Sequence, residues 1–206
     1  PEEAHGLCCS QIWEHKGNPA GQRLTANRTI ESFYKWSGGG RIPIFCDTTS
    51  CTHTLLFETG GDILTPENRE KYKQLKIMDI TQWLKEVVLP RIKVIRPKNR
   101  ILLHPTCSCQ IMGLTPVLLD IARKCAREVI LPDNWGCCGA SGDRGFIFPE
   151  LSDSATRDER DEIGHESFDG CYSLARTCEI AMQDHIEQPY ESIVYLVDET
   201  IQDQGT

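Results

Sequence analysis

The sequence lacks the features that mark several large classes of protein. No apolar run approaches the roughly 20 residues that a membrane span needs. A Gly-x-Gly-x-x-Gly motif, a phosphate loop and a Ser/His/Asp arrangement are all missing, so this chain by itself offers no site for FAD or NAD. A basic stripe is missing too, and the net charge of −8 with a pI of about 5.3 argues against nucleic acid as a main partner.

Cysteine is the residue that the sequence has in excess. The chain has 206 residues with ordinary hydrophobic and charged fractions of 39% and 25%, yet it carries eleven cysteines. Their number is odd and four of them form two adjacent pairs, which rarely bond to each other because the ring would be strained. These features favour a reducing compartment and metal-binding or redox cysteines over a disulfide scaffold.

The first part of the chain contains signals for three helices and one strand. The pattern predicts a helix over 18–37, a short buried strand over 41–47 and a helix with Cys51 near its start. It then predicts an amphipathic helix over 77–89. The basic segment 91–100 is predicted as a hairpin or a sheet edge.

The second part alternates strands, cysteine loops and helices, as in a parallel α/β sheet whose loops gather at one end. The predicted strands are 100–104 and 128–132, and the predicted helices are 115–127, 148–163, 177–187 and 190–201, with a loop over 164–170. The acidic run from Asp158 to Glu162 is predicted to face solvent. The expected fold class is therefore α/β with layers of parallel strands and helices.

The cysteines also indicate an internal duplication. Cys8-Cys9 precedes Cys137-Cys138 by 129 residues, and Cys51 precedes Cys178 by 127. We expect residues 1–90 to hold the second half of one copy plus a connecting helix, and 91–206 to hold a complete second copy. The chain begins with Pro, and the opening cysteine of the first copy is expected upstream, in a longer protein.

Four cysteines of the second copy come from three loops and are candidate metal ligands. They are Cys107, Cys137, Cys138 and Cys178. Four thiolates suit a [4Fe–4S] cluster, and zinc also accepts sulfur ligands. Zinc sites are usually built on Cys-x-x-Cys knuckles, which this sequence lacks, so an iron–sulfur cluster is favoured. Adjacent cysteines could ligate two different irons of an open or split cluster, and the flanking glycines would supply N–H donors.

Other cysteines and one histidine have plainer interpretations. Cys125 lies within a predicted helix and is expected to be a small buried apolar residue. Cys109 and Cys171 are expected to be bystanders. Cys46 is either a core residue or a ligand, and His104 is either structural or functional.

The motifs resemble a known family. Gly136-Cys137-Cys138-Gly139, with His104-Pro105-Thr106-Cys107 before it, resembles the cysteine-rich CCG domain. That domain occurs in heterodisulfide reductase subunits, in the iron–sulfur subunit of glycolate oxidase and at the C-terminus of certain large flavoproteins. Longer strings are similar to the last group; they lie at 46–52, 104–113, 137–146, 149–152 and 176–180.

This group consists of FAD-linked D-2-hydroxyacid dehydrogenases of the D-lactate or D-2-hydroxyglutarate type, with a fused iron–sulfur region. The resemblance implies that FAD, on an upstream domain or a separate flavin subunit, oxidises the hydroxy acid. Iron–sulfur centres, [4Fe–4S] or noncubane, then pass electrons to a quinone, a cytochrome or another acceptor. The chain would belong to an enzyme without containing catalytic residues. A cytoplasmic location is expected, including the cytoplasmic face of the membrane.

The resemblance also implies two ligand sets. The first is Cys107, Cys137, Cys138 and Cys178; the second is Cys8, Cys9 and Cys51, together with Cys46. Two alternatives stay open at this point. One is a CCG subunit of a heterodisulfide reductase-like or glycolate oxidase-like complex. The other is a non-enzymatic, zinc-structured interaction module.

Overall fold

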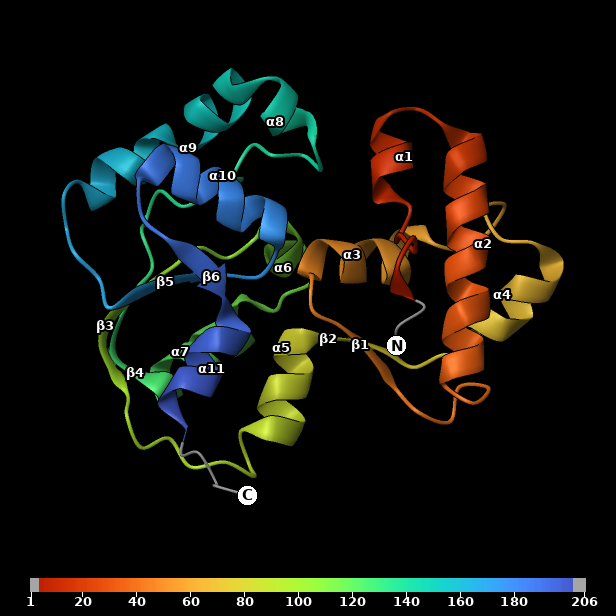
Figure 1. Ribbon diagram of the computed structural model, residues 1–206, viewed down its shortest axis with the longest axis horizontal. Coiled ribbons are helices and arrows are strands. Elements are labelled where there is room, and N and C mark those ends of the chain that lie inside the picture. Colours follow the sequence, from red (N-terminus) through yellow and green to blue (C-terminus); the bar gives the residue numbers. More distant parts are fainter. Residues whose placement is uncertain (1–3, 202–206) are drawn as a thin grey trace. The chain divides into compact units, whose positions relative to one another are not determined.

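The structure is a computed structural model that describes residues 4–201 (Figure 1). It is mixed α/β, 53% helical, with parallel strands in two sheets, which confirms the expected α/β class. The chain divides between Asp79 and Ile80 into two compact units, called here the first unit and the second unit. The predicted copies, 1–90 and 91–206, stay a prediction.

The first unit joins a long helix to a two-stranded parallel sheet. Its elements are α1 (Gln11–His15), α2 (Pro19–Trp36), β1 (Ile44–Cys46), α3 (Thr49–His53), the π-helix η2 (Thr54–Glu58), α4 (Pro66–Tyr72) and β2 (Ile77–Asp79). Strands β1 and β2 pair in parallel, with Phe45 opposite Met78. A small apolar core of Ala26, Ile30 and Leu64 lies between α2 and the segment before α4.

Local signals set both ends of α2. The Asn18 side chain accepts a hydrogen bond of 2.9 Å from the Gly21 N–H, and Pro19 occupies the first helical position. After Trp36 the chain turns through three glycines with positive φ. A Cβ on Gly40 would lie 2.1 Å from the Gln74 carbonyl oxygen, so this turn requires glycine.

The second unit contains a larger sheet with helices on both faces (Figure 1). Its elements are α5 (Ile80–Trp83), the π-helix η3 (Leu84–Val88), β3 (Lys98–Leu103), α6 (Cys107–Ile111), α7 (Thr115–Cys125), β4 (Ala126–Ile130), α8 (Arg144–Ile147), α9 (Pro149–Ile163), β5 (Gly170–Ser173), α10 (Arg176–Ile186), β6 (Tyr190–Ser192) and α11 (Ile193–Thr200).

The four strands are parallel and follow the order β4-β3-β5-β6. Alternate residues of β3 point to opposite faces of this sheet. Ile101 and Leu103 enter a core formed with α7 and α11, whereas Leu102 enters a second core formed with α9 and α10. All three leucine and isoleucine side chains are 0% exposed, as expected for a strand covered on both faces.

Three short strands were not predicted as such. The predicted helices 77–89 and 190–201 each begin with a strand, β2 and β6, and β5 begins at Gly170, where a loop was expected. Segments of three or four residues are too short for periodicity to distinguish a strand from the first turn of a helix. These strands are defined instead by their pairing: β2 with β1, β5 with β3, and β6 with β5.

Several predicted boundaries also move. Lys98 and Arg100 belong to β3, where they pair in parallel with Ala126 and Glu128 of β4, so the last residues of 91–100 do not form a hairpin. Helix α7 ends at Cys125 because β4 begins at the next residue, two residues earlier than predicted. Strand β1 is shorter than predicted and only half-buried, with Phe45 46% exposed.

The order of elements after each cysteine pair is alike. Each pair is followed by a short helix, a long helix, a strand and a helix that carries a further cysteine, Cys51 or Cys178: α1, α2, β1 and α3 in the first unit, and α8, α9, β5 and α10 in the second. A parallel strand comes later in both units, β6 directly after α10 and β2 after η2 and α4. Duplication of the sequence itself stays a prediction.

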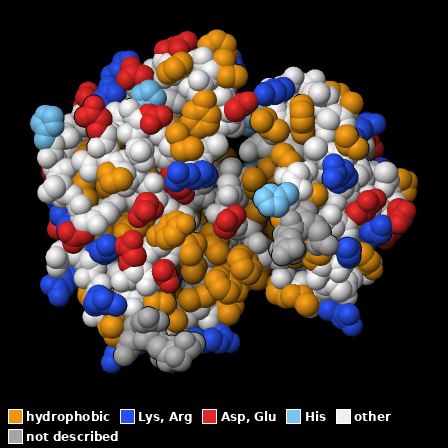
Figure 2. All heavy atoms as spheres, viewed as in Figure 1, with side chains coloured by type: hydrophobic (Ala, Val, Ile, Leu, Met, Phe, Trp, Pro, Cys, Tyr) orange, Lys and Arg blue, Asp and Glu red, His pale blue; other side chains and the backbone are white. Residues whose placement is uncertain are grey.

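The surface agrees with the composition. Acidic and basic side chains are interspersed over the face shown in Figure 2. Among residues 4–201, none of the helices combines the length and the apolar character that a membrane crossing requires.

Candidate functional site: the two cysteine sets

Three adjacent parallel strands bring the cysteines of the second unit together. Cys107 is the first residue of α6, after β3; Cys137 and Cys138 lie in the loop after β4; and Cys178 lies in the first turn of α10, after β5. The carboxyl ends of parallel strands meet at one edge of a sheet, where α/β proteins bind ligands. Cys107 was expected in a loop, but the Thr106 side chain caps a helix there by accepting a bond of 3.2 Å from the Cys109 N–H.

The four side chains of this set touch one another in a row. Cys107 is hydrogen-bonded to Cys137, and Cys137 is hydrogen-bonded to Cys138. The Sγ atoms of Cys138 and Cys178 lie 2.9 Å apart. Cys107 and Cys137 are exposed, whereas Cys138 and Cys178 are only 4% and 7% exposed, so the row runs from solvent into the core shared with α9 and α10.

Backbone N–H groups are directed at the sulfurs. Gly139 N–H donates to Cys137 Sγ over 3.4 Å, and the N–H groups of Ala140 and Ser108 are hydrogen-bonded to Cys138 and Cys107. Such donors stabilise negative charge on sulfur, in a free thiolate or in a cluster. The predicted donation of glycine N–H groups to cluster sulfide stays a prediction.

The thiols of the row are not equivalent. The pKa of Cys137 lies well below the ordinary thiol value because Cys107 and Cys138 donate to its sulfur, with further help from the Gly139 N–H and from the charge of His104. The pKa values of Cys107 and Cys138 are raised, chiefly because each donates its proton to Cys137. Among the four thiols of the set, Cys137 is the one whose thiolate form is most favoured.

The loop with the cysteine pair packs directly on the N-terminal turn of α9. A Cβ on Gly139 would lie 2.7 Å from the Leu151 carbonyl oxygen and 2.7 Å from Ser152 Cα, and the residue has a φ of +75°. Gly145 is similarly close to Ser152 Oγ, at 2.5 Å from a Cβ position. Gly139 is needed for the approach of the loop backbone to the α9 backbone, and Gly145 for the packing of α8 against the loop backbone and the Ser152 side chain.

The first unit gathers its own set. Cys8 is hydrogen-bonded to Cys9, which is hydrogen-bonded to Cys51 at the third position of α3. The pKa of Cys8 is raised by its bond to Cys9 and by burial, and that of Cys9 is raised to about 12, first by Cys51. Cys46, at the end of β1, is close enough to Cys9 to interact electrostatically, and burial raises its pKa to about 11.

Ser10 follows the first cysteine pair as Gly139 follows the second. Its φ is +81°, in the left-handed region that favours glycine, and its N–H donates to Cys8 Sγ over 3.4 Å. The two loops therefore present an N–H to the first cysteine of each pair from a residue with a similar positive φ.

His104 and Glu159 form a buried pair beside the second set. His104 Nδ1 lies 2.9 Å and 3.1 Å from the two carboxylate oxygens of Glu159, and the side chains are 1% and 2% exposed. His104 Nε2 is also buried and has no hydrogen-bond partner among the described residues. The edge of the ring meets Tyr190, with centroids 6.5 Å apart.

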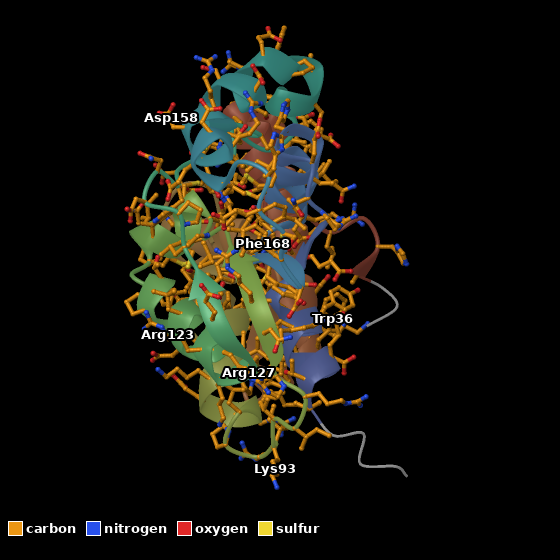
Figure 3. All side chains as sticks on the ribbon, turned by 90° about the vertical axis from the view of Figure 1, so that its left-hand side faces the viewer. Trp36, Lys93, Arg123, Arg127, Asp158 and Phe168 are labelled. Atoms are coloured by element: carbon orange, nitrogen blue, oxygen red, sulfur yellow. The ribbon has the colours of Figure 1, made fainter. Side chains whose placement is uncertain are left out.

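The prediction that the run from Asp158 to Glu162 faces solvent is wrong for Glu159. The buried residues of α9 are Ser152, Thr156, Glu159 and Ile163, spaced by four, three and four positions. This spacing forms one helical face, so the pattern could have placed Glu159 inside. Its neighbour Asp158 does project outward from α9 (Figure 3).

The cysteines outside the two sets are buried. Cys109 and Cys125 lie in the core with α7 and α11, on the opposite face of the sheet from Cys138 and Cys178. Cys125 is 0% exposed, as expected for a small core residue. Cys171 lies in the same core as Cys138, where burial raises its pKa to about 12.

The donor set fits an iron–sulfur cluster in kind and number: four thiols with N–H donors. The described residues 4–201 contain no group of three or more His, Cys, Asp or Glu side chains already spaced to hold a metal ion. The Cys138 and Cys178 sulfurs, 2.9 Å apart, are closer than the roughly 3.8 Å between sulfurs on one tetrahedral zinc with about 2.3 Å bonds. They must separate before any metal group can lie between them.

No protein-family model matches the chain, and no curated protein matches its sequence.

Proposed function

We propose that this chain is the iron–sulfur electron-transfer region of a FAD-dependent D-2-hydroxyacid dehydrogenase of the D-lactate type. The observation that supports this most is the convergence of Cys107, Cys137, Cys138 and Cys178 from the ends of three neighbouring strands. Cys8, Cys9, Cys51 and Cys46 form the corresponding set of the first unit.

The chain's own residues bind and tune a cluster, which accepts and releases single electrons when bound. The four thiolates would hold it, and the N–H groups of Gly139, Ala140 and Ser108 would stabilise its negative charge. Cys107 and Cys137 are exposed, so a cluster held there would be accessible to an electron-transfer partner on their side. Cys138 and Cys178 face the core, which keeps water away from the other side.

The other steps belong to partners of the chain. FAD, bound by an upstream domain or a separate subunit, would supply the oxidation of the hydroxy acid by accepting its hydride. A quinone, a cytochrome or another acceptor receives the electrons. We place the complex in the cytoplasm or on the cytoplasmic face of the membrane.

Anaerobic reconstitution tests the cluster. The protein should take up iron and acid-labile sulfide and acquire a brown, reducible absorbance. Cys138→Ala should lose the part of the iron bound by the second unit, whereas Cys125→Ala, in the apolar core on the other face of the sheet, should retain it. Colourless, iron-free wild-type protein would refute the proposal. Stoichiometric zinc without iron would instead favour a zinc-structured interaction module.

A second candidate is thiol–disulfide chemistry, as in a heterodisulfide reductase-like subunit. The contact of 2.9 Å between Cys138 and Cys178 and the lowered pKa of Cys137 favour it. Oxidation of two cysteine thiols to one protein disulfide would reduce one substrate disulfide to two thiols, with both protons passing to the products. The reduced, iron-free protein would then react stoichiometrically with 5,5′-dithiobis(2-nitrobenzoate), and Cys137→Ala would remove the fastest phase.

A further inference from the structure

Two buried thiols of the second set lie almost within bonding distance. The Sγ atoms of Cys138 and Cys178 are 2.9 Å apart, whereas a disulfide holds its two sulfurs at about 2.05 Å. Closing the difference takes a movement of about 0.9 Å. One cysteine follows β4 and the other follows β5, and these strands lie on either side of β3. A bond would therefore join two separate loops at one edge of the sheet.

The two thiols are held by the fold in different ways. Cys138 precedes Gly139, whose backbone lies against α9 without space for a Cβ. Cys178 lies in the first turn of α10, whose Ala175 start has no capping side chain. A movement of about 0.9 Å is no larger than an ordinary thermal displacement in a folded protein. The start of α10 can therefore supply the movement while the cysteine loop stays in place.

The other contacts of the row are less suited to a lasting bond. Cys137 and Cys138 are adjacent in sequence, and a bond between them would close a strained ring. Cys107 and Cys137 are exposed, and exposed disulfides are readily reduced. Cys138 and Cys178 are 4% and 7% exposed, so a bond between these two sulfurs would be shielded by the core.

We propose that Cys138 and Cys178 form a reversible disulfide when the second set is empty, and that this bond closes the set to metal until it is reduced. Two S–H bonds break and one S–S bond forms, and the two electrons and two protons reduce hydrogen peroxide to two molecules of water. Two of the four ligands are then bonded to each other, which protects both from irreversible oxidation to sulfinic acid. The closing of the set rests on the proposed function, whereas the bond itself does not.

Peptide mapping of the reduced, metal-free protein tests the bond. The protein is treated with hydrogen peroxide, the remaining thiols are alkylated, and the product is digested with trypsin. The sequence then yields peptide 128–144, which contains Cys137 and Cys138, and peptide 177–206, which contains Cys178. We expect mass spectrometry to find these two peptides joined, and to find them separate after treatment with dithiothreitol.

Variants identify the sulfurs that form the bond. The link should disappear in Cys138→Ala and in Cys178→Ala, and it should persist in Cys137→Ala, which keeps the buried pair. Cys171→Ala is the matched control, because Cys171 is 2% exposed in the same core, and it should also keep the link.

Three outcomes would overturn the proposal. The first is a wild-type protein in which peptide 177–206 stays unlinked. The second is loss of the link in Cys137→Ala, which would assign the bond to the exposed cysteine. The third is a link from 128–144 to 101–123, the peptide that contains Cys107, in place of the expected one.

Iron uptake tests the closing of the set. In Cys9→Ala any iron belongs to the second unit, so the oxidised variant, reconstituted without added thiol, should bind at least about tenfold less iron than the reduced variant. Dithiothreitol should restore the uptake. Equal uptake by both forms would overturn the closing of the set. If the reduced variant binds no iron while the two peptides are joined, the proposed function fails for this set and the disulfide stands.

Discussion

At the scale of single residues, the position after each cysteine pair determines how an N–H reaches sulfur. Ser10 and Gly139 have φ values of +81° and +75°, and each N–H that follows the first cysteine by two residues points at its Sγ. Glycine adopts this conformation freely, whereas serine is strained in it.

Replacing Ser10 by glycine should therefore stabilise the protein. The left-handed conformation costs a residue with a side chain about 1–2 kcal/mol, and the greater entropy of glycine in the unfolded chain offsets part of this. The expected gain in the free energy of unfolding is therefore about 1 kcal/mol. Urea unfolding measures it. Ser10→Ala keeps a Cβ and should give no gain; equal stabilisation by alanine would contradict the strain argument.

The opposite change at Gly139 should be harmful. Gly139→Ala meets both the positive φ and backbone atoms of α9 at 2.7 Å, so we expect a loss of about 2–3 kcal/mol. Gly136→Ala is the matched control, because nothing lies within 4 Å of a Cβ at Gly136. Similar unfolding midpoints for the two variants would show that the loop does not depend on its approach to α9.

Residue identity could be predicted where chemistry restricts the choice. The eight proposed ligands were selected because adjacent and regularly offset cysteines are unusual, and the structure gathers them into two groups. Glu159 was missed because a charged residue within an acidic run is normally solvated. Its partner His104 lies 55 residues away in the sequence, and no local pattern joins them.

At the scale of elements, α9 contacts the loop that carries Cys137 and Cys138 at two places. Gly139 rests on its first turn, and near its end Glu162 accepts hydrogen bonds of 2.7 Å and 2.8 Å from the N–H groups of Asp133 and Asn134, just before the cysteine pair. These two bonds lower the pKa of Glu162. The helix therefore holds both sides of the loop.

A carboxyl group whose pKa is lower in the folded than in the unfolded protein stabilises the fold. This stabilisation is fully present at pH values above the unfolded pKa of about 4.3, and it is lost as the pH falls through the folded pKa. Glu162→Gln should therefore be less stable than wild type at pH 7, and the difference should vanish in strong acid. The effect is small because Glu162 is exposed to solvent. Asp158→Asn, at the outward position of the same helix, should show no such change; equal pH profiles of Glu162→Gln and wild type would refute the role of Glu162.

Long elements could be predicted and short ones could not. Helices α2, α9 and α10 begin and end within about a residue of their predicted limits, because each has many turns and a proline or polar start. Strands β2, β5 and β6 have three or four residues and depend on neighbours distant in sequence. Only pairing identifies such strands.

At the scale of the whole molecule, each unit has its own core and its own cysteine set. If both sets bind clusters, iron should be lost in two independent portions. Cys9→Ala should remove one portion, Cys138→Ala the other, and the double variant all of it. Complete iron loss in either single variant would show that the sets are not independent.

The close approach of Gly139 to α9 determines which cysteines of the second set can change position. Cys138 is next to Gly139, whose contact with the backbone of α9 leaves no room for movement, so Cys138 is held in place. Cys178 lies in the first turn of α10, whose Ala175 start has no capping side chain. We therefore expect that any separation of the two sulfurs, which lie 2.9 Å apart, comes from a shift of Cys178 with the start of α10, while Cys138 stays in place.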